Sequence, residues 1–385
     1  MKRKFILAIL LAAVFISLCG CKRKNEQLQK QAEATSIKIG HVGHDHHIAL
    51  FVALDNIAQY HKESGINLKT IKDRKFYEMY DKGKKIADIE IVKVGGGSKM
   101  PTALAQDVIE VGFGGVAAVL AAADSGAPVK MISPLHYKGD MFVLRGDFNA
   151  DNWRQFIATA KAAEKPLRIG YKNPVAVAKL VFEEALKHEQ ITFSGDLSRS
   201  DVQVHMVNTK GGGKLNVSLA GGLIDGYVGN NPFPAIAVEK KIGKVICDLE
   251  KLPPGTFRNH PCCCIAANTN AIEEKSEAIV DLLILFFQAN ETINNDLNKA
   301  VASATRWIGT SETVEKMSIP TSGYSMEATG QWHQTMEKWI QAMNGLDIFT
   351  GNLRAADYKQ VTAVAYDLTL LEKARIKFAQ RKTEK

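Results

Sequence analysis

Two series of strands alternating with helices constrain the fold of this chain more than any other feature of its sequence. The first series opens with an apolar strand at 37–41 and a helix at 48–61, and continues with a strand at 109–113. The second opens with a strand at 167–170 and a helix at 175–187. Because parallel strands need long crossover connections, usually helices, each series predicts a sheet wound by helices. The predicted fold class is α/β with two lobes.

The chain is expected to pass between the lobes more than once. A proline-rich break at 232–234 ends the second series, and two later strands, 245–249 and 263–267, are interpreted as a return to the first lobe. The segment 72–86, dense in Lys, Asp, Arg and Tyr, is predicted to be an exposed excursion outside the core. The resulting boundaries are 36–145 plus 232–290 for the first lobe, 146–231 for the second lobe and 291–385 for a C-terminal helical region.

The N-terminus has the pattern of a secretory signal. Basic residues at 2–4 precede an uncharged apolar run at 5–18, which is shorter than the roughly 20 residues of a transmembrane helix. The run ends at Leu18-Cys19-Gly20-Cys21, which resembles the lipobox of bacterial lipoprotein precursors and implies a signal peptide at 1–20 and diacylglycerol on Cys21. Residues 21–35 are predicted to form a flexible tether. A plain secretory signal remains the alternative.

The charge balance favours an anionic partner. The formal net charge is +8, but the basic residues are not clustered as nucleic-acid binding requires, so no nucleic-acid partner is predicted. Outside the signal, no segment reaches about 18 uninterrupted apolar residues. The sequence has neither a Gly-x-Ser-x-Gly elbow nor a dinucleotide fingerprint with its acid, and no catalytic residue is assigned.

Short blocks in a fixed order, spread over roughly 36–290, carry a family resemblance: 37–40, 49–54, 95–98, 101–104, 110–115, 168–171 and 225–232. Together they resemble the nitrate/sulfonate/taurine/thiamine-precursor family of ABC-transporter substrate-binding proteins. The resemblance implies a periplasmic-binding-protein-like fold of type II, in which each lobe is a wound mixed sheet and the two lobes close on a solute by a hinge.

The resemblance also implies a function. With the lipobox, it predicts an extracytoplasmic lipoprotein, anchored through Cys21, that binds a small solute and passes it to ABC permease subunits. The resemblance does not identify the solute. The positive charge and the glycine-rich loops favour an anion of the nitrate, sulfonate or bicarbonate type, whereas the histidines and cysteines favour a metal or an aromatic heterocycle. The resemblance implies a monomer with no cofactor and no enzymatic activity. A lipid-anchored sensor, which would contact a signalling receptor instead of a permease, stays open as a further hypothesis.

Two glycine-rich loops are candidate anion cradles. Residues 95–99 and 210–214 each follow a predicted strand and precede a helix, and each ends in a lysine. Glycine lets a ligand approach the backbone closely, and ligands of wound sheets bind at the carboxyl ends of strands. The alternative is a pair of ordinary glycine-rich turns.

A histidine cluster at 43–47 and a cysteine triplet at 262–264 are the unusual features that remain. A related branch of the fold, which makes a thiamine pyrimidine, carries a Cys-Cys-Cys-Phe-Cys motif, iron and a reactive histidine, and the resemblance leaves open a metal- or thiol-dependent enzyme that uses His44–His47 with Cys262–Cys264. Here Ala266 replaces the last cysteine of that motif. We favour small apolar residues of a buried strand and assign no metal ligand.

Because neighbouring residues of a strand point to opposite faces, a disulfide within the triplet is not expected, whereas Cys247 could pair with one of its members. The other candidates are polar residues that follow predicted strands. The predicted ligand-binding residues are His44, His46, His47, Gly97, Ser98, Lys99, Gly114, Gly115, His136, Tyr137, Tyr171, Asn173, Lys210, Gly211 and Asn230.

Overall fold

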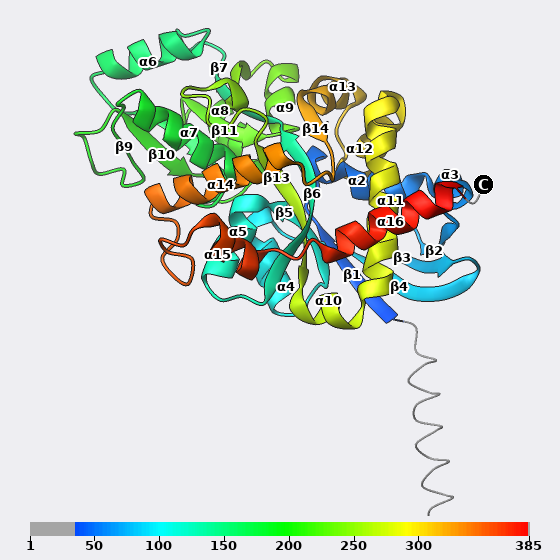
Figure 1. The fold of residues 1–385 in the computed structure, drawn as a ribbon. Coiled ribbons are helices and arrows are strands. Elements are labelled where there is room, and N and C mark those ends of the chain that lie inside the picture. The colour runs from blue at the N-terminus through cyan, green and yellow to red at the C-terminus, as the bar shows by residue number, and fades with distance from the viewer. Residues whose placement is uncertain (1–34, 384–385) are drawn as a thin grey trace, which may run out of the picture.

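The computed structural model describes residues 35–383, which form two sheets surrounded by helices (Figure 1). The first sheet has eight strands in the order β14-β6-β13-β5-β1-β4-β3-β2, and the second has six in the order β12-β7-β11-β8-β10-β9. Parallel and antiparallel pairs occur in both sheets. The predicted two-lobed α/β fold with mixed sheets is confirmed.

The first sheet is built around β1 (Thr35–His41), which runs parallel to both β4 (Lys84–Lys93) and β5 (Val111–Gly115). Its long strand β13 (Pro261–Asn268) lies antiparallel to β5 and to β6 (Val129–Lys138). Its remaining strands are β2 (Ile66–Lys72), β3 (Phe76–Asp81) and β14 (Ser322–Tyr324). Its associated N-terminal helices are α2 (Ile48–Asp55), α3 (Ile57–Ser64), α4 (Met100–Ala105) and α5 (Val116–Asp124).

The prediction that 72–86 is an exposed excursion was wrong. Within that segment, β3 pairs antiparallel with β2 on one side and with β4 on the other. Tyr77 and Met79 point into the core and are fully buried or nearly so. Several of the charged residues that suggested a loop lie in the connections on either side of β3, at 73–75 and at Lys82, and Glu78 lies on the face of the strand opposite Tyr77 and Met79.

The second sheet consists of β7 (Asp140–Arg145), β8 (Leu167–Tyr171), β9 (Phe193–Ser194), β10 (Val204–Asn208), β11 (Gly226–Asn230) and β12 (Gly243–Asp248). Its helices are α6 (Trp153–Ala162), α7 (Val177–His188), α8 (Leu215–Ala220) and α9 (Phe233–Glu239). The expectation that the strand at 245–249 returns to the first lobe was wrong, because β12 pairs antiparallel with β7 of the second sheet. For the same reason β7 belongs to the second sheet although we placed it in the first lobe.

The chain crosses between the sheets at Gly139, between β6 and β7, and again between β12 and β13. Gly139 has φ +80°, and a Cβ atom there would collide with Ser322 Oγ and lie 3.0 Å from His46 Nε2. Only glycine combines this backbone conformation with so close an approach. The first crossing is therefore packed directly against the histidine cluster.

The region after 291 belongs to the body of the protein. Its helices are α12 (Leu297–Ile308), α13 (Glu312–Ser318), α14 (Gly330–Gly345), α15 (Tyr358–Ala365) and α16 (Thr369–Thr383), and they follow α10 (Thr269–Glu274) and α11 (Ser276–Asn295). In Figure 1, α16 lies across α11, and β14 joins the edge of the first sheet beside β6. Asp124 accepts hydrogen bonds from the backbone N–H groups of Thr350, Gly351 and Leu353 at 2.7–2.9 Å, which ties this region to α5.

Within residues 35–383, no helix has the length and apolar character needed to cross a bilayer. The predicted signal peptide, Cys21 and most of the tether lie outside the described residues. The four cysteines that the structure describes, Cys247 and Cys262–Cys264, are all free thiols, so Cys247 does not pair with the triplet.

Candidate functional site

A cleft of about 620 Å³ lies between the ends of strands from the two sheets. The first sheet contributes residues 42–44, 93–97 and Lys99, and the second contributes residues 172–174, Asn208, 210–213, Asn230 and Phe233. Both predicted cradle loops therefore line one cleft, which they approach from opposite sides. This is the place where ligands bind in wound sheets, beyond the carboxyl ends of the strands.

The two glycine-rich loops have nearly the same backbone conformation. Gly96 has φ 150° and ψ 153°, and a short 3-10 helix η2 (Gly97–Lys99) leads from it into α4. Gly211 has φ 141° and ψ 147°, and η3 (Gly212–Lys214) leads in the same way into α8. Both φ values lie in the region that side chains rarely adopt, so glycine is required at each position. The two lobes thus present matching backbone surfaces to the cleft.

The cleft is positively charged. Lys93 and Lys99 reach it from the first lobe, and Lys172 and Lys210 from the second. Among the described residues that line it, none is acidic. Lys172 Nζ donates to Asn230 Oδ1 at 2.6 Å, and Asn230 Nδ2 donates to Asn231 O at 2.7 Å. Asn230 thus holds the Lys172 ammonium in place without neutralising it.

The floor of the cleft on the first-lobe side is the histidine loop. After β1 the chain turns through η1 (Asp45–His47), which brings the His44 ring centroid to 4.2 Å from that of His47 and 5.4 Å from that of His46. Only His44 of these three lines the cleft, and all three side chains are buried. Burial, and then the positive charges of His47 and Lys172, hold the pKa of His44 well below its usual range, so the ring is neutral at pH 7.

Beneath the floor, histidine and cysteine side chains converge. His46 Nδ1 lies 3.4 Å from Cys262 Sγ and 3.9 Å from Cys263 Sγ, and the rings of His46 and His136 are 3.8 Å apart. Burial, followed by the neighbouring His136, lowers the pKa of His46 to about 4. His46 therefore offers a neutral ring next to two thiol groups, and the ring of His136 packs against it, in a space that solvent does not reach.

Two neighbouring cysteines reach the same histidine because β13 is irregular there. The pairing of β13 with β6 shifts register between Pro261 and Cys263 and again between Cys263 and Cys264. Such bulges re-aim side chains and break the strict alternation of a strand. The expectation that Cys262 and Cys263 point to opposite faces was therefore wrong. Cys264 points elsewhere, and its thiol donates to Gly114 O at 3.5 Å.

Asp140 and His260 form a second layer around the thiols. Cys262 Sγ donates to Asp140 Oδ2 at 3.1 Å, and His260 Nε2 lies 3.5 Å from the same oxygen. His260 Nδ1 donates to Phe257 O at 2.8 Å. Burial opposes a charge on Asp140, but the hydrogen bond from His260 and the nearby positive groups keep the pKa of Asp140 below its ordinary value.

The structure separates the predicted ligand-binding residues into groups. Seven line the cleft: His44, Gly97, Lys99, Asn173, Lys210, Gly211 and Asn230, and Ser98 lies in the same loop. His46, His47 and His136 lie beneath the floor, and Gly114 and Gly115 end β5 next to the cysteines. Tyr137 faces a different pocket and donates to Glu327 O, while Tyr171 is buried outside the cleft lining.

Sequence reasoning missed several residues of the site. Lys93, Lys172, Asn208 and Phe233 line the cleft, and Asp140 and His260 flank the thiols. Lys172 stands between the predicted Tyr171 and Asn173, directly after β8, so position was a usable signal. Lys172 and Asn173 line the cleft, whereas Tyr171 does not. Which of these successive side chains face the cleft depends on the local backbone conformation, which no sequence pattern indicated.

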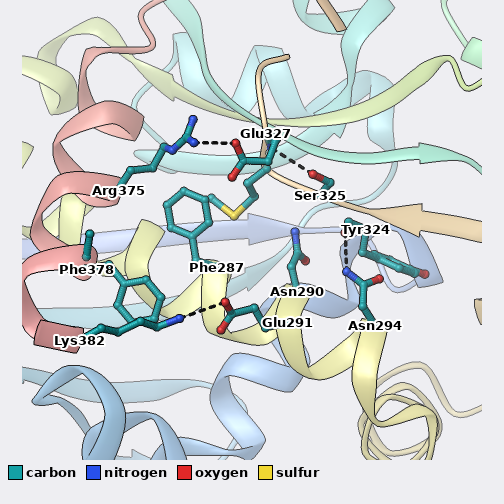
Figure 2. A pocket seen from close by; sticks show the side chains of 12 residues that line it. Phe287, Asn290, Glu291, Asn294, Tyr324, Ser325, Glu327, Arg375, Phe378 and Lys382 are labelled. Carbon is teal, nitrogen blue, oxygen red and sulfur yellow. Dashed lines mark hydrogen bonds and ion pairs between the residues drawn. The ribbon is translucent and has the colours of Figure 1, made fainter. Parts of the chain in front are cut away.

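A second pocket, of about 350 Å³, lies between α11, α16 and the segment around β14 (Figure 2). Its charged side chains are paired with each other: Arg375 with Glu327 at 2.8 Å and Lys382 with Glu291 at 3.2 Å. Phe287 and Phe378 supply its apolar wall. These ion pairs leave less charge for recognising an anion than the lysines of the cleft do.

Residues 30–308 match the model of the NMT1-like family. The chain belongs to the NMT1-like family. Among curated proteins, an uncharacterized protein of Methanocaldococcus jannaschii, MJ1180, is 33% identical over 137 residues, which cover 35% of this chain and 91% of that protein.

Several solved structures share the fold of this NMT1-like protein. The ligand-binding component of an ABC-type import system from Staphylococcus aureus, with zinc bound, superposes with a TM-score of 0.68 at 15% identity and covers 88% of this chain and 99% of its own. The periplasmic nitrate-binding protein NrtA from Synechocystis gives 0.65 at 12% identity, covering 89% of each chain. The alkanesulfonate-binding protein SsuA from Xanthomonas axonopodis gives 0.61 at 12% identity, covering 83% and 95%.

Proposed function

We propose that this protein is the extracytoplasmic solute-binding component of an ABC importer and that it captures a small anion of the nitrate, sulfonate or bicarbonate type. One observation carries the proposal: the cleft holds two glycine-rich loops of like conformation and four lysines, and its described lining contains no acid. The nitrate- and alkanesulfonate-binding proteins that share its fold make an anion the natural first ligand to test.

Charge and shape both support an anion as the cargo. Bringing four ammonium groups to one cleft is unfavourable unless a negative charge enters between them. Two lysines on each lobe allow a bound anion to contact both lobes at once, which favours hinge closure around it. The carbonyl and amide groups of Asn230 and the close approach allowed by Gly96 and Gly211 then determine the orientation of the solute.

The enzyme alternative is less well supported. Cys262 and Cys263 are 3% and 5% exposed, His46 is 1% exposed, and none of the three lines the cleft. A solute in the cleft therefore does not reach the thiols, which a thiol-dependent reaction requires. We propose binding and release without turnover, as a monomer that contacts permease subunits.

The proposal that the protein binds a small anion is tested by adding candidate solutes to the mature protein without its lipid. A panel of nitrate, alkanesulfonates, bicarbonate and neutral heterocycles is compared by thermal unfolding. We expect one anion class to raise the midpoint, since a ligand at about 100 times its dissociation constant adds roughly 2.7 kcal/mol to the stability of the native state. Small-angle scattering should show compaction with the same anion. Stabilisation by neutral compounds alone, or consumption of the ligand, would contradict the proposal.

We propose in addition that the protein is anchored to a bacterial membrane by lipid on Cys21, which lies outside the described residues. Replacing Cys21 with Ala in the expressed precursor should move the protein from the membrane fraction to the soluble extracytoplasmic fraction. Cys19→Ala is the matched control, because Cys19 leaves with the predicted signal peptide and should not matter. Mass spectrometry of the protein from the membrane fraction should find diacylglycerol on the Cys19→Ala variant and none on the Cys21→Ala variant; the absence of lipid from both would refute lipid anchoring.

A further inference from the structure

We propose that His46, His136, Cys262 and Cys263 form a closed binding site for one zinc-type transition-metal ion, built beneath the floor of the solute cleft. One ligand atom of each of these four side chains lies within 4.8 Å of the others, and all four residues are buried. The ion would be a resident structural component and not the transported solute. The inference is independent of which solute the cleft binds.

The donor set matches the coordination preferences of zinc. Two thiolates and two imidazoles at tetrahedral angles are typical of structural zinc sites, whereas Ca²⁺ and Mg²⁺ prefer oxygen ligands. Zinc–ligand bonds of about 2.0 to 2.3 Å place sulfur and nitrogen ligands about 3.5 Å apart. The distances from His46 Nδ1 to Cys262 Sγ and Cys263 Sγ are 3.4 and 3.9 Å, so small side-chain movements complete the site.

The spacing of the cysteines along the chain is unlike that of most zinc sites, which separate two cysteines by about 2–4 residues. The register shifts of β13 remove that objection. They turn the side chains of Cys262 and Cys263 to the same face of the strand, where both meet His46. In other zinc sites a loop between two cysteines lets both side chains reach the ion; here the bulge in β13 has the same effect on two adjacent cysteines.

Neighbouring groups already orient the ligands. His46 Nε2 donates to Gly139 O at 3.2 Å, which places the proton on Nε2 and leaves the Nδ1 lone pair directed at the thiols. Metal-binding histidines typically use the second ring nitrogen in this way. His136 Nδ1 accepts a hydrogen bond from Cys263 N at 3.2 Å, and its buried Nε2 has no hydrogen-bond partner among the described residues. Binding of the ion by His136 therefore requires this backbone hydrogen bond to be given up, so that one ring nitrogen presents its lone pair to the ion.

All four ligand positions are supplied by the protein, and the site is shut off from solvent. Zinc sites of this kind are structural, whereas catalytic zinc keeps an open position for water or substrate. Here the ion would link three separate segments: the loop after β1, the end of β6 and the start of β13. Because the His44 ring lies 5.4 Å from the His46 ring and lines the cleft, metal binding would also fix one wall of the solute site.

The test uses the mature protein, refolded without metal and dialysed against zinc alone. We expect one zinc per chain by elemental analysis. Cobalt should replace it and produce the visible absorption bands of a tetrahedral thiolate site. His46→Gln and Cys262→Ser should each weaken zinc binding by at least about 100-fold, since even loss of an orienting group costs about 10- to 100-fold. The matched controls are His188→Gln, an exposed histidine of α7, and Cys247→Ser, a free cysteine of the second sheet.

The cobalt spectrum of the unaltered protein keeps the test decisive even where a variant folds poorly. Asp140→Asn adds a check on a neighbour that is not a ligand: it removes a carboxylate 3.1 Å from Cys262 Sγ that opposes the thiolate form, so zinc affinity should be kept or raised and not lost. An octahedral cobalt spectrum, less than one tenth of an equivalent of zinc, or equal binding by the His46 and His188 variants would each overturn the proposal. None of these outcomes depends on solute binding, so failure of the metal-site proposal and failure of the proposed import function can be distinguished.

Discussion

Replacing Trp339 with Ala is expected to lower the free energy of unfolding by about 3–5 kcal/mol, the usual cost of removing a large buried aromatic side chain. Trp339 lies in α14 and is fully buried. Its ring centroid is 4.4 Å from that of Phe257, and its Nε1 donates to Pro261 O at 3.0 Å. The substitution leaves both a cavity and an unpaired carbonyl at the entrance to β13.

Chemical denaturation of the mature protein measures this effect. Trp339→Phe should recover part of the loss, because it keeps a six-membered aromatic ring but removes the five-membered ring and its N–H; leaving Pro261 O unpaired alone costs about 1–3 kcal/mol. Gln341→Ala, an exposed position on the same helix, should change the stability by less than about 0.5 kcal/mol. Equal stabilities for Trp339→Ala and Gln341→Ala would mean that α14 does not support the cysteine strand.

Replacing Lys172 with Gln is expected to weaken binding of the anionic solute by about 10- to 100-fold. A hydrogen bond to a charged group contributes about 1.5–3 kcal/mol, and each 1.4 kcal/mol corresponds to a factor of ten in affinity. Lys172 is half-buried and is held in the cleft by Asn230, and its positive charge is one of the causes that lower the pKa of His44. Its positive charge is therefore poorly screened by solvent.

Isothermal titration with the anion selected from the panel measures the change. Lys161→Gln is the matched control, because Lys161 is exposed on α6 of the same lobe and does not line the cleft. An affinity of the Lys172→Gln variant equal to that of the unaltered protein would show that the charge of Lys172 takes no part in recognition. A parallel loss in both variants would indicate only long-range attraction of the anion to a basic protein.

Much of the fold could be predicted because the hydrophobic period changes visibly from strands to helices along the chain. Assignment of strands to sheets was harder. β7 and β12 look like first-lobe strands by position, but their partners are each other and β11, and no local pattern records a hydrogen-bond partner. β3 was mistaken for a loop because the connections on either side of it carry so many charges that the buried Tyr77 and Met79 were overlooked.

Site residues that lie at or just after the ends of strands could be predicted from the sequence. Those brought together by an irregular backbone could not. The glycine-rich loops and Asn230 follow strands, and the structure places all of them at the cleft. The approach of His46 to Cys262 spans 216 residues and requires a bulge in β13, which the run of three cysteines does not announce. His136 joins that group only because β6 and β13 are neighbours in the sheet.

The equal division of the cleft lysines between the lobes has a consequence for how a loaded molecule differs from an empty one. Lys93 and Lys99 on one lobe face Lys172 and Lys210 on the other, so closing the empty cleft pushes like charges together. The same closure around an anion replaces repulsion with attraction from both sides. Under the import function proposed above, anion binding would favour the closed arrangement of the lobes, whereas repulsion between the lysines would disfavour closure of the empty cleft.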